Sequence, residues 1–372
     1  MPDVSLMRLA SAIYVVFILL AVFVRATDGR SSSLTFPDFF VIGAMKCGTT
    51  SLNKLMYDHP SICDYGDKEK HFFDKDEYDS EYDEHLENYE SEFSGCKKRL
   101  YKIDSTPSYI QYPYVPARIN ESYTRDDLLR KKFLLVIREP VSRFYSQYQM
   151  RLRVCFKGLY WTNSREATDD DETKLRLHRN CKGVMHNYTM HLLDEPKKHH
   201  RFRSFSEWVR ESEDGVEEIS RGYYFDHIQD WLKYVPRKII YIVDFADLIA
   251  RTNSTMFNIA KFLSIEPEEW FHSGGAHFKA NGVTLPKPKY QKPEFANGAL
   301  DCATFDWLVA KYNAKNENLK DFINFASGQR PVGEPLFAGW NYTTRHCSPT
   351  SQQTVGPPSK HSPPGRKLGT TI

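Results

Sequence analysis

Short apolar runs alternate along the chain with longer segments of mixed polarity. The runs cover residues 39–42, 100–103, 133–137 and 238–243, and each is bounded by a polar turn. Unbroken apolar runs of this length are typical of strands buried on both faces. Because the segments between them have helical character, the pattern predicts an α/β fold. We expect a doubly wound parallel sheet flanked by helices, with ligands at the carboxyl ends of its strands.

Two helices are expected between the first and second runs. Residues 49–59 form the first, and Pro60 stops it because proline lacks a backbone N–H and clashes with the preceding turn. An acidic stretch that ends near Phe93 predicts the second. Strands and helices therefore alternate in sequence.

The first apolar run breaks into a loop of small residues and then restarts as a helix. Glycines at Gly43 and Gly48 let backbone N–H groups converge on an anion at the positive end of that helix. The spacing copies the loop that binds nucleoside triphosphates, but that motif requires lysine where this chain has Thr49. The lysine here is Lys46, inside the loop. The pattern predicts a site for a phosphate or sulfate ester; the alternatives are an ordinary tight strand–helix connection or another nucleotide loop.

A second strand end carries residues suited to a phosphate. Arg138 directly follows the run 133–137, Pro140 opens a helix, and Ser146 lies within that helix. Arginine binds phosphate as a charged fork and serine through its hydroxyl. The alternative is a solvated arginine and a serine on the helix surface, which are common at strand ends.

Composition indicates a globular protein. The 372 residues are 41% hydrophobic and 14% aromatic, which is enough for a packed core in one large domain or two small ones. The formal net charge of +2 gives no global field that attracts polyanions. Nucleic acid is therefore not an expected partner, and an acidic polymer would need a local basic patch.

The N-terminus predicts entry into the secretory pathway. Residues 9–24 form an uncharged run of 16 residues, and a membrane-spanning helix needs roughly 17 to 25. Residues 1–26 are therefore either a short signal-anchor or a cleaved signal peptide. A luminal address also agrees with four glycosylation acceptor triplets, at Asn120, Asn187, Asn253 and Asn341.

Seven cysteines in an oxidising lumen predict up to three disulfides and one remaining thiol. Cys47 is the expected free thiol, because a small side chain is wanted inside the anion loop, and we interpret it as a packing residue rather than a nucleophile. Cys155 and Cys181 bracket a polar insertion and form a plausible pair.

Three sequence motifs together resemble a known family. The loop from Gly43 to Ser51 is similar to the 5′-phosphosulfate loop of sulfotransferases that use 3′-phosphoadenosine 5′-phosphosulfate (PAPS). Residues 138–148 match their second signature, Arg-Asp/Glu-Pro-x-x-Arg-x-x-Ser-x-Tyr. Residues 68–74, Lys-Glu-x-His-Phe-Phe-Asp, resemble the catalytic segment of the heparan sulfate sulfotransferases and their carbohydrate-sulfotransferase relatives, chondroitin-type enzymes included. The resemblance covers roughly residues 36–325.

This resemblance implies roles for individual residues. Glu69 is the expected general base and His71 an assisting polar group, while Lys46 meets the charge that develops on the leaving phosphate. Arg138 and Ser146 would hold the 3′-phosphate of the donor. The remaining expected donor-binding residues belong to the loop: Cys47, Gly48, Thr49, Thr50 and Ser51.

The resemblance also implies the reaction and its setting. PAPS would be the co-substrate, no metal would be needed, and the acceptor would be a hydroxyl, less readily an amine, of a glycan such as an acidic polysaccharide. The expected location is the Golgi lumen, as a single-pass type II membrane protein attached through its N-terminal segment; the alternative is secretion after signal cleavage.

Two departures set this chain apart from the heparan sulfate 3-O-sulfotransferases. Their turn Glu-Lys-Thr-Pro carries a lysine near the reaction centre, and this chain has Ser105 at that position. Their later paired cysteines and Lys-Gly-Arg loop are not evident between residues 280 and 298. Lys287, Lys289 and Lys292 are candidates to serve the nucleotide instead.

The expected organisation is a single catalytic domain over residues 37–330, preceded by a short stem at 27–36 and followed by a disordered tail at 348–372. Residues 152–203 form an insertion that we interpret as an acceptor-side loop, the alternative being a solvated, disulfide-stapled insertion. Two other functions compete with the sulfotransferase hypothesis. A nucleotide-dependent kinase is disfavoured by the missing Gly-Lys-Ser/Thr, and a catalytically silent glycan-binding relative is suggested by Ser105.

Overall fold

The computed structural model describes most of the chain between residues 37 and 325. The described residues are 37–64, 69–75, 82–97, 100–160, 171–186, 201–211, 213–267, 278–279, 282–283 and 301–325. Several predictions lie outside them, namely those on the N-terminal segment and stem, the tail, Asn187, Asn341, Lys287, Lys289 and Lys292.

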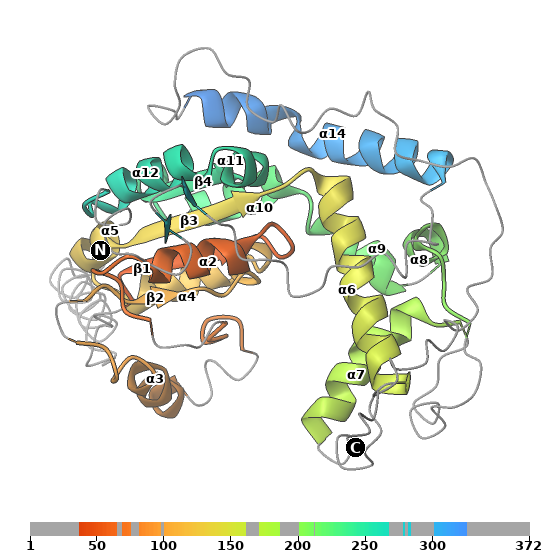
Figure 1. Cartoon of the computed structure of the whole chain (residues 1–372), viewed down its shortest axis with the longest axis horizontal. Coiled ribbons are helices and arrows are strands. Elements are labelled where there is room, and N and C mark those ends of the chain that lie inside the picture. Colours follow the sequence, from red (N-terminus) through yellow and green to blue (C-terminus); the bar gives the residue numbers. More distant parts are fainter. Residues whose placement is uncertain are drawn as a thin grey trace, which may run out of the picture.

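A parallel sheet of four strands forms the centre of the structure (Figure 1). Its strands are β1 (Phe39–Gly43), β2 (Ile103–Asp104), β3 (Lys132–Ile137) and β4 (Ile240–Asp244), in the order β2-β1-β3-β4. Nearly every strand residue is buried. The predicted α/β fold with a parallel sheet is therefore confirmed, and the apolar runs that predicted it supply the strands in its core.

Two strands are shorter than their apolar runs. The run 100–103 gives only β2, because Tyr101 forms an isolated parallel bridge with Ile62 before the ladder begins. The run 238–243 begins with a 3₁₀ turn, η4 (Arg237–Ile239), which follows Pro236 and delays β4 to Ile240. Likewise, the first helix ends at Tyr57 rather than residue 59.

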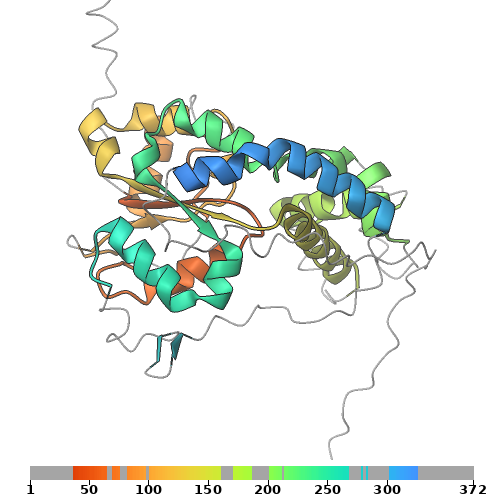
Figure 2. The same ribbon diagram turned by 90° about the horizontal axis from the view of Figure 1, so that it is seen from above.

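Helices cover both faces of the sheet (Figure 2). The helices on one side are α2 (Thr49–Tyr57), α11 (Phe245–Ala250) and α12 (Thr252–Leu263). Those on the other side are α4 (Val115–Ser122), α5 (Arg125–Arg130) and α10 (Tyr224–Leu232). The other elements of this part are α3 (Tyr82–Ser91), the 3₁₀ turn η1 (Tyr109–Gln111), which contacts β1, and the hairpin strands β5 (Phe278–Lys279) and β6 (Gly282–Val283), of which β6 contacts α12.

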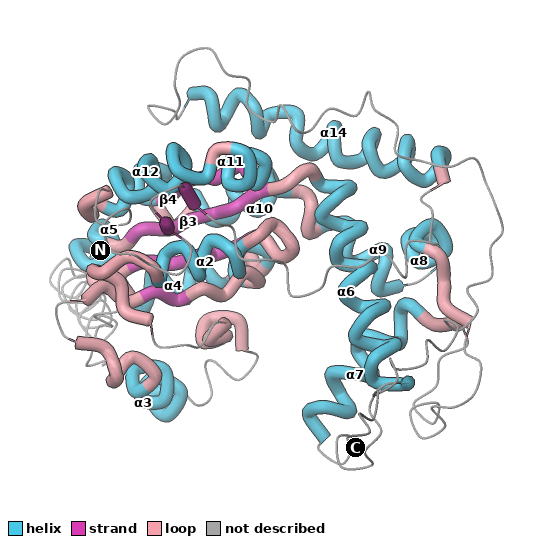
Figure 3. Tube along the Cα trace, in the orientation of Figure 1, coloured by secondary structure: helices cyan, strands magenta, loops and turns pink. Residues whose placement is uncertain are grey.

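A second group of helices packs around its own apolar cluster, apart from the strands (Figure 3). Its members are α6 (Pro140–Tyr160), α7 (Asp171–Val184), α8 (Phe205–Glu211), α9 (Glu213–Ser220) and the first half of the long α14 (Cys302–Phe325). Leu319 and Ile323, in the second half of α14, belong to the core around the sheet. The predicted insertion lies largely here. The described part of the insertion is helical rather than an irregular loop, and its apolar residues share one cluster with Phe205 and Trp208. Its acceptor-side role stays a prediction.

The cysteine predictions are confirmed where the structure describes them. Cys155 and Cys181 form a disulfide that joins α6 to α7. Cys63 pairs with Cys96, and Cys302 is also disulfide-bonded. Cys47 is a free, buried thiol.

Two of the four acceptor asparagines are in described elements. Asn120 is half-buried on α4, and Asn253 is exposed near the start of α12. Within the described part of the chain, no helix is both long and apolar enough to cross a bilayer.

Candidate functional site

The loop after β1 depends on its two glycines for space. A Cβ on Gly43 would lie 2.4 Å from Cγ2 of Ile110, and one on Gly48 would lie 2.5 Å from the ring of Phe245. Gly48 also has a φ of 88°, in the left-handed region that side chains disfavour, and it is the N-cap of α2. The first N–H groups of α2 therefore lie at the loop, at the positive end of the helix.

Arg138 and Lys46, predicted from separate motifs, meet in the structure. Nη1 of Arg138 donates a hydrogen bond of 3.3 Å to the carbonyl oxygen of Lys46. The guanidinium of Arg138 lies 4.8 Å from the centre of the Phe245 ring, which fixes it against α11. Two cationic residues thus stand at the carboxyl ends of β1 and β3, beside the start of α2.

Tyr224 joins the loop to the end of β3. Its hydroxyl donates to the carbonyl oxygen of Arg138 at 2.8 Å and lies 3.5 Å from Sγ of Cys47. Burial raises the pKa of the Cys47 thiol, so the group stays protonated at neutral pH. This agrees with a packing role for Cys47.

The other predicted donor residues lie nearby in sequence but differ in exposure. Thr49 is buried, Ser51 is half-buried and Thr50 is exposed, all in the first turn of α2. Ser146 is half-buried on α6, which begins at Pro140 as predicted. The carboxylate of Glu139 caps that helix by accepting from the N–H groups of residues 141 and 142 at 2.6 Å each.

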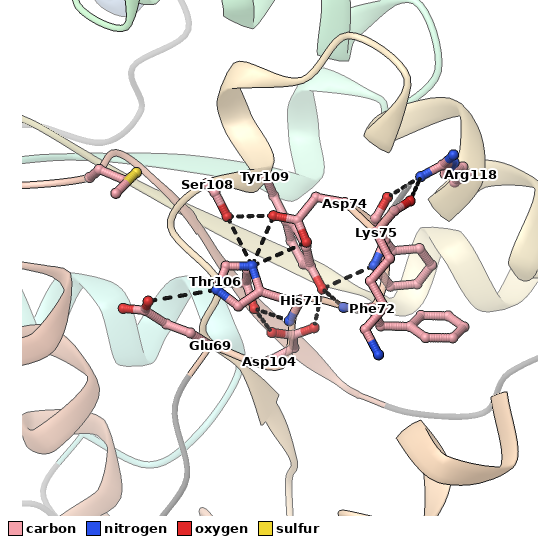
Figure 4. Close-up of polar contacts among 12 residues, drawn as sticks. Glu69, His71, Phe72, Asp74, Lys75, Asp104, Thr106, Ser108, Tyr109 and Arg118 are labelled. Carbon is pink, nitrogen blue, oxygen red and sulfur yellow. Dashed lines mark hydrogen bonds and ion pairs between the residues drawn. The ribbon is translucent and has the colours of Figure 1, made fainter. Parts of the chain in front are cut away.

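Glu69 and His71 stand side by side on a segment without regular secondary structure (Figure 4). Oε2 of Glu69 lies 3.8 Å from Nε2 of His71, and both side chains are partly exposed, to 42% and 47% respectively. The N–H of Glu69 donates to the carbonyl oxygen of Ser105 at 3.0 Å. Because Ser105 follows β2 and Lys46 follows the adjacent parallel strand β1, both belong to the same edge of the sheet.

His71 is held between two carboxylates. Its Nδ1 lies 3.0 Å from Oδ2 of Asp74, whose side chain is buried and accepts a further hydrogen bond of 2.6 Å from Ser108. Asp74 and then Glu69 raise the pKa of His71 to about 10. The imidazole is therefore positively charged at neutral pH. Its pairing stabilises the fold fully below pH 6.5, and that contribution is lost as pH rises through about 10.

Ser105, which takes the place of the lysine of the heparan sulfate 3-O-sulfotransferases, is buried. Ser105 is 2% exposed, and among the described residues its hydroxyl has no hydrogen-bond partner. Lys70 does not take the place of that lysine, because its buried side chain pairs with Glu92 next to α3. Glu69 instead has the imidazole of His71 as a cationic neighbour.

Sequence reasoning missed several residues that support this site. Asp74 and Ser108 fix His71, Tyr224 fixes the loop, and Phe245 supports Arg138. Asp74 lies within the motif at residues 68–74, but nothing in that motif indicates its contact with His71. Among the described residues, no group of three His, Cys, Asp or Glu side chains could hold a metal ion.

Comparison with known proteins identifies one family. The family described as "Sulfotransferase domain" matches residues 36–281. The chain is 23% identical over 340 residues to the membrane-associated sulfotransferase kil1 of Dictyostelium discoideum, covering 78% of this chain and 66% of that protein. It is 25% identical over 231 residues to heparan sulfate glucosamine 3-O-sulfotransferase 5 of human and mouse, covering 62% of this chain and 54% of each relative.

Solved structures of sulfotransferases also align with this chain. The sulfotransferase from Alicyclobacillus acidocaldarius shares 19% identity with it, with a TM-score of 0.49, over 78% of this chain and 97% of that one. The chain spans about half to two-thirds of the length of the curated relatives described above.

Proposed function

The chain belongs to the sulfotransferase domain family, and on that premise we propose that it transfers a sulfuryl group from PAPS to a hydroxyl of a glycan. The observation that carries the proposal is the meeting of Arg138 and Lys46 at the start of α2. An arginine, a lysine and a helix N-terminus at one sheet edge suit a ligand that carries both a phosphosulfate and a separate phosphate.

In this proposal the donor is held in two places. Its 5′-phosphosulfate lies against the loop from Lys46 to Ser51, where the N–H groups of α2 and the lysine face the anion. Its 3′-phosphate is held by Arg138 and by Ser146, which is half-buried on α6. No metal ion takes part, since the loop and the two cations provide the positive charge.

The reaction is an in-line displacement at sulfur. The acceptor oxygen forms the new S–O bond, the bond to the 5′-phosphate breaks, and 3′-phosphoadenosine 5′-phosphate (PAP) leaves. Glu69 accepts the proton of the acceptor hydroxyl, and Lys46 stabilises the charge that builds on the leaving phosphate. His71 cannot share the role of base, because it is already protonated; it orients the Glu69 carboxylate and adds positive charge beside it.

A glycan acceptor is supported by the relatives, several of which are named heparan sulfate glucosamine 3-O-sulfotransferases. An acidic polysaccharide is the acceptor that we propose, with transfer to an amine as the less favoured variant. A second candidate is a catalytically silent glycan-binding relative, suggested by the buried Ser105 in place of the family lysine. We favour the enzyme because Lys46, Glu69, Arg138 and Ser146 are all present.

Replacing Arg138 with Ala is expected to weaken PAP binding by about 1.5 to 3 kcal/mol, because one charge-assisted phosphate contact is removed. Titration calorimetry in the absence of Mg²⁺ measures this directly, and the wild-type protein should bind PAP under those conditions. Arg125→Ala, which removes an exposed arginine from the start of α5, is the matched control. Unchanged affinity in Arg138→Ala would place the 3′-phosphate elsewhere, and tight Mg²⁺-dependent ATP binding would contradict the choice of donor.

We also propose a luminal location, in the Golgi, with the N-terminal segment as signal-anchor or cleaved signal. Support comes from the uncharged run at residues 9–24 and from Asn253, whose exposed position on α12 suits a glycan. Treatment of the protein from a eukaryotic host with an N-glycosidase should increase its mobility on a gel, and Asn253→Gln should reduce that shift. An unchanged mobility would argue against the lumen.

A further inference from the structure

The segment that carries Glu69 and His71 is held in an unusual backbone conformation. Residues 69–75 form neither helix nor strand, and the φ angles of Glu69 and His71 are 69° and 53°. Side chains disfavour this left-handed region, so such a conformation persists only where its surroundings fix it.

Two buried hydroxyls accept hydrogen bonds from the backbone N–H groups of this segment. Oγ1 of Thr106 accepts from the N–H of His71 at 3.3 Å. The hydroxyl of Tyr109 accepts from the N–H groups of Phe72 and Phe73 at 3.1 and 3.3 Å. Three successive N–H groups of the segment are thus bound to the polypeptide that follows β2 (Figure 4).

Both hydroxyls converge on one carboxylate. Thr106 donates to Oδ1 of Asp104 at 2.6 Å, and Tyr109 donates to Oδ2 at 2.8 Å. Tyr89 of α3 donates to the same Oδ2 at 2.9 Å. Asp104, at the end of β2, is completely buried. Because an ionised carboxylate only accepts hydrogen bonds, it forces each hydroxyl to point its proton inward and to offer its lone pairs to the segment.

From this arrangement we infer that Asp104 is a positioning residue, which acts through Thr106 and Tyr109 to hold Glu69 and His71 in their working orientation. The inference rests on the proposed function, since it assigns those two residues to the reaction centre. Asp104, Thr106 and Tyr109 themselves touch neither donor nor acceptor in this account.

The cost of the buried charge supports a positioning role. Burial, with a smaller contribution from the nearby charge of Asp74, raises the pKa of Asp104 to about 6. The three hydroxyl donors lower this pKa and offset part of the rise. At neutral pH the carboxylate is therefore ionised at the expense of folding free energy. A protonated or amide group in its place could still accept hydrogen bonds, but it would not force both hydroxyls to donate.

Two substitutions of Thr106 separate an effect on the orientation of Glu69 and His71 from an effect on the stability of the fold. Thr106→Val keeps the buried shape and removes the hydroxyl, whereas Thr106→Ser keeps the hydroxyl and removes one methyl group. We expect Thr106→Val to lower kcat by roughly 10²-fold, the loss typical of a small misplacement of reacting groups, with the KM for PAPS and the affinity for PAP unchanged. Thr106→Ser should restore most of the kcat. Tyr109→Phe, which retains the ring packed against Phe73, should also lower kcat.

Hydrogen exchange gives a readout that does not depend on activity. Amides in residues 69–75 should exchange faster in Thr106→Val than in either the wild type or Thr106→Ser, with the rest of the sheet unaffected. Equal kcat and equal exchange in the two variants would overturn the inference, as would equal losses in both. If the wild type transfers no sulfate, the proposed function fails by itself, and the exchange result still decides whether the hydroxyls fix this segment.

Discussion

Replacement of Glu69 by Gln is expected to lower turnover by roughly 10²- to 10⁴-fold, the usual contribution of a general base. Glutamine keeps the size of the side chain and most of its hydrogen bonding, but it cannot accept the proton of the acceptor hydroxyl. PAP affinity should barely change, because the proposed role of Glu69 concerns the acceptor rather than the donor. Initial rates with labelled PAPS, together with PAP calorimetry, measure the two quantities separately.

The test of Glu69 has a matched control variant, and His71 is the alternative base to be considered. Glu87→Gln makes the same chemical change at an exposed position on α3 and should leave the rate unaltered. His71 is not expected to substitute as the base, since Asp74, the larger cause of its raised pKa, is still present in Glu69→Gln and keeps the imidazole protonated. Near-normal sulfation by Glu69→Gln would therefore mean that the base lies outside this segment altogether.

Replacement of Lys46 by Ala is expected to weaken both PAP binding and turnover. In the proposed mechanism the ammonium group contacts the donor phosphate in the ground state and the charge that develops on the leaving group in the transition state. We expect PAP affinity to fall about 10-fold or more, from the loss of one charge-assisted contact, and kcat to fall further. Calorimetry and rates with saturating PAPS separate the two effects.

The substitution of Lys46 by Ala is not expected to change the backbone conformation of the loop. Lys46 has a φ of 69°, which alanine tolerates no better and no worse than lysine, and the carbonyl that accepts from Arg138 is retained. Lys54→Ala removes an exposed lysine from the adjoining helix, α2, and is the matched control. If Lys46→Ala binds PAP as the wild type does, the donor phosphate does not contact this lysine.

The sheet, and the positions of Gly48 and Arg138 at the carboxyl ends of its strands, could be predicted because local sequence patterns encode them. Buried parallel strands need apolar runs, and the turn after β1 needs Gly48, so both features are visible in sequence. Arg138 comes directly after the run that forms β3. Because β1 and β3 are parallel, Arg138 lies at the same edge of the sheet as the loop after β1. A motif that sits at a strand end is therefore readily placed in space.

The support beneath Glu69 was not predictable, because it is made by contacts between distant segments. Asp104 receives hydrogen bonds from Tyr89 on α3 and from Tyr109 on η1 as well as from its neighbour Thr106. An aspartate after a strand has many possible partners, and no local pattern selects these. The charge state of His71 was hidden for the same reason, since it depends on Asp74 being buried and fixed by Ser108.

The helices of the insertion at residues 152–203 were not predicted from the sequence. Its sequence is polar on average, with acidic and basic runs, and it predicted either an acceptor-side loop or a solvated, disulfide-stapled insertion. Its few apolar residues, Leu177, Val184 and Met185 among them, find partners on α6 and α8, and the Cys155–Cys181 disulfide holds α7 against α6. Tertiary partners therefore stabilise helices that composition alone does not suggest.

The central claim is sulfuryl transfer from PAPS to a glycan, and incubation of the wild-type protein with PAPS labelled in the sulfuryl group tests it most directly. The panel should contain heparan sulfate, desulfated heparosan, chondroitin and a neutral glycan, with Glu69→Gln run in parallel. We predict that the wild type labels at least one acidic polysaccharide without added Mg²⁺, and that Glu69→Gln does not. Tight PAP binding with no label in any acceptor would contradict the account and identify the protein as a silent relative.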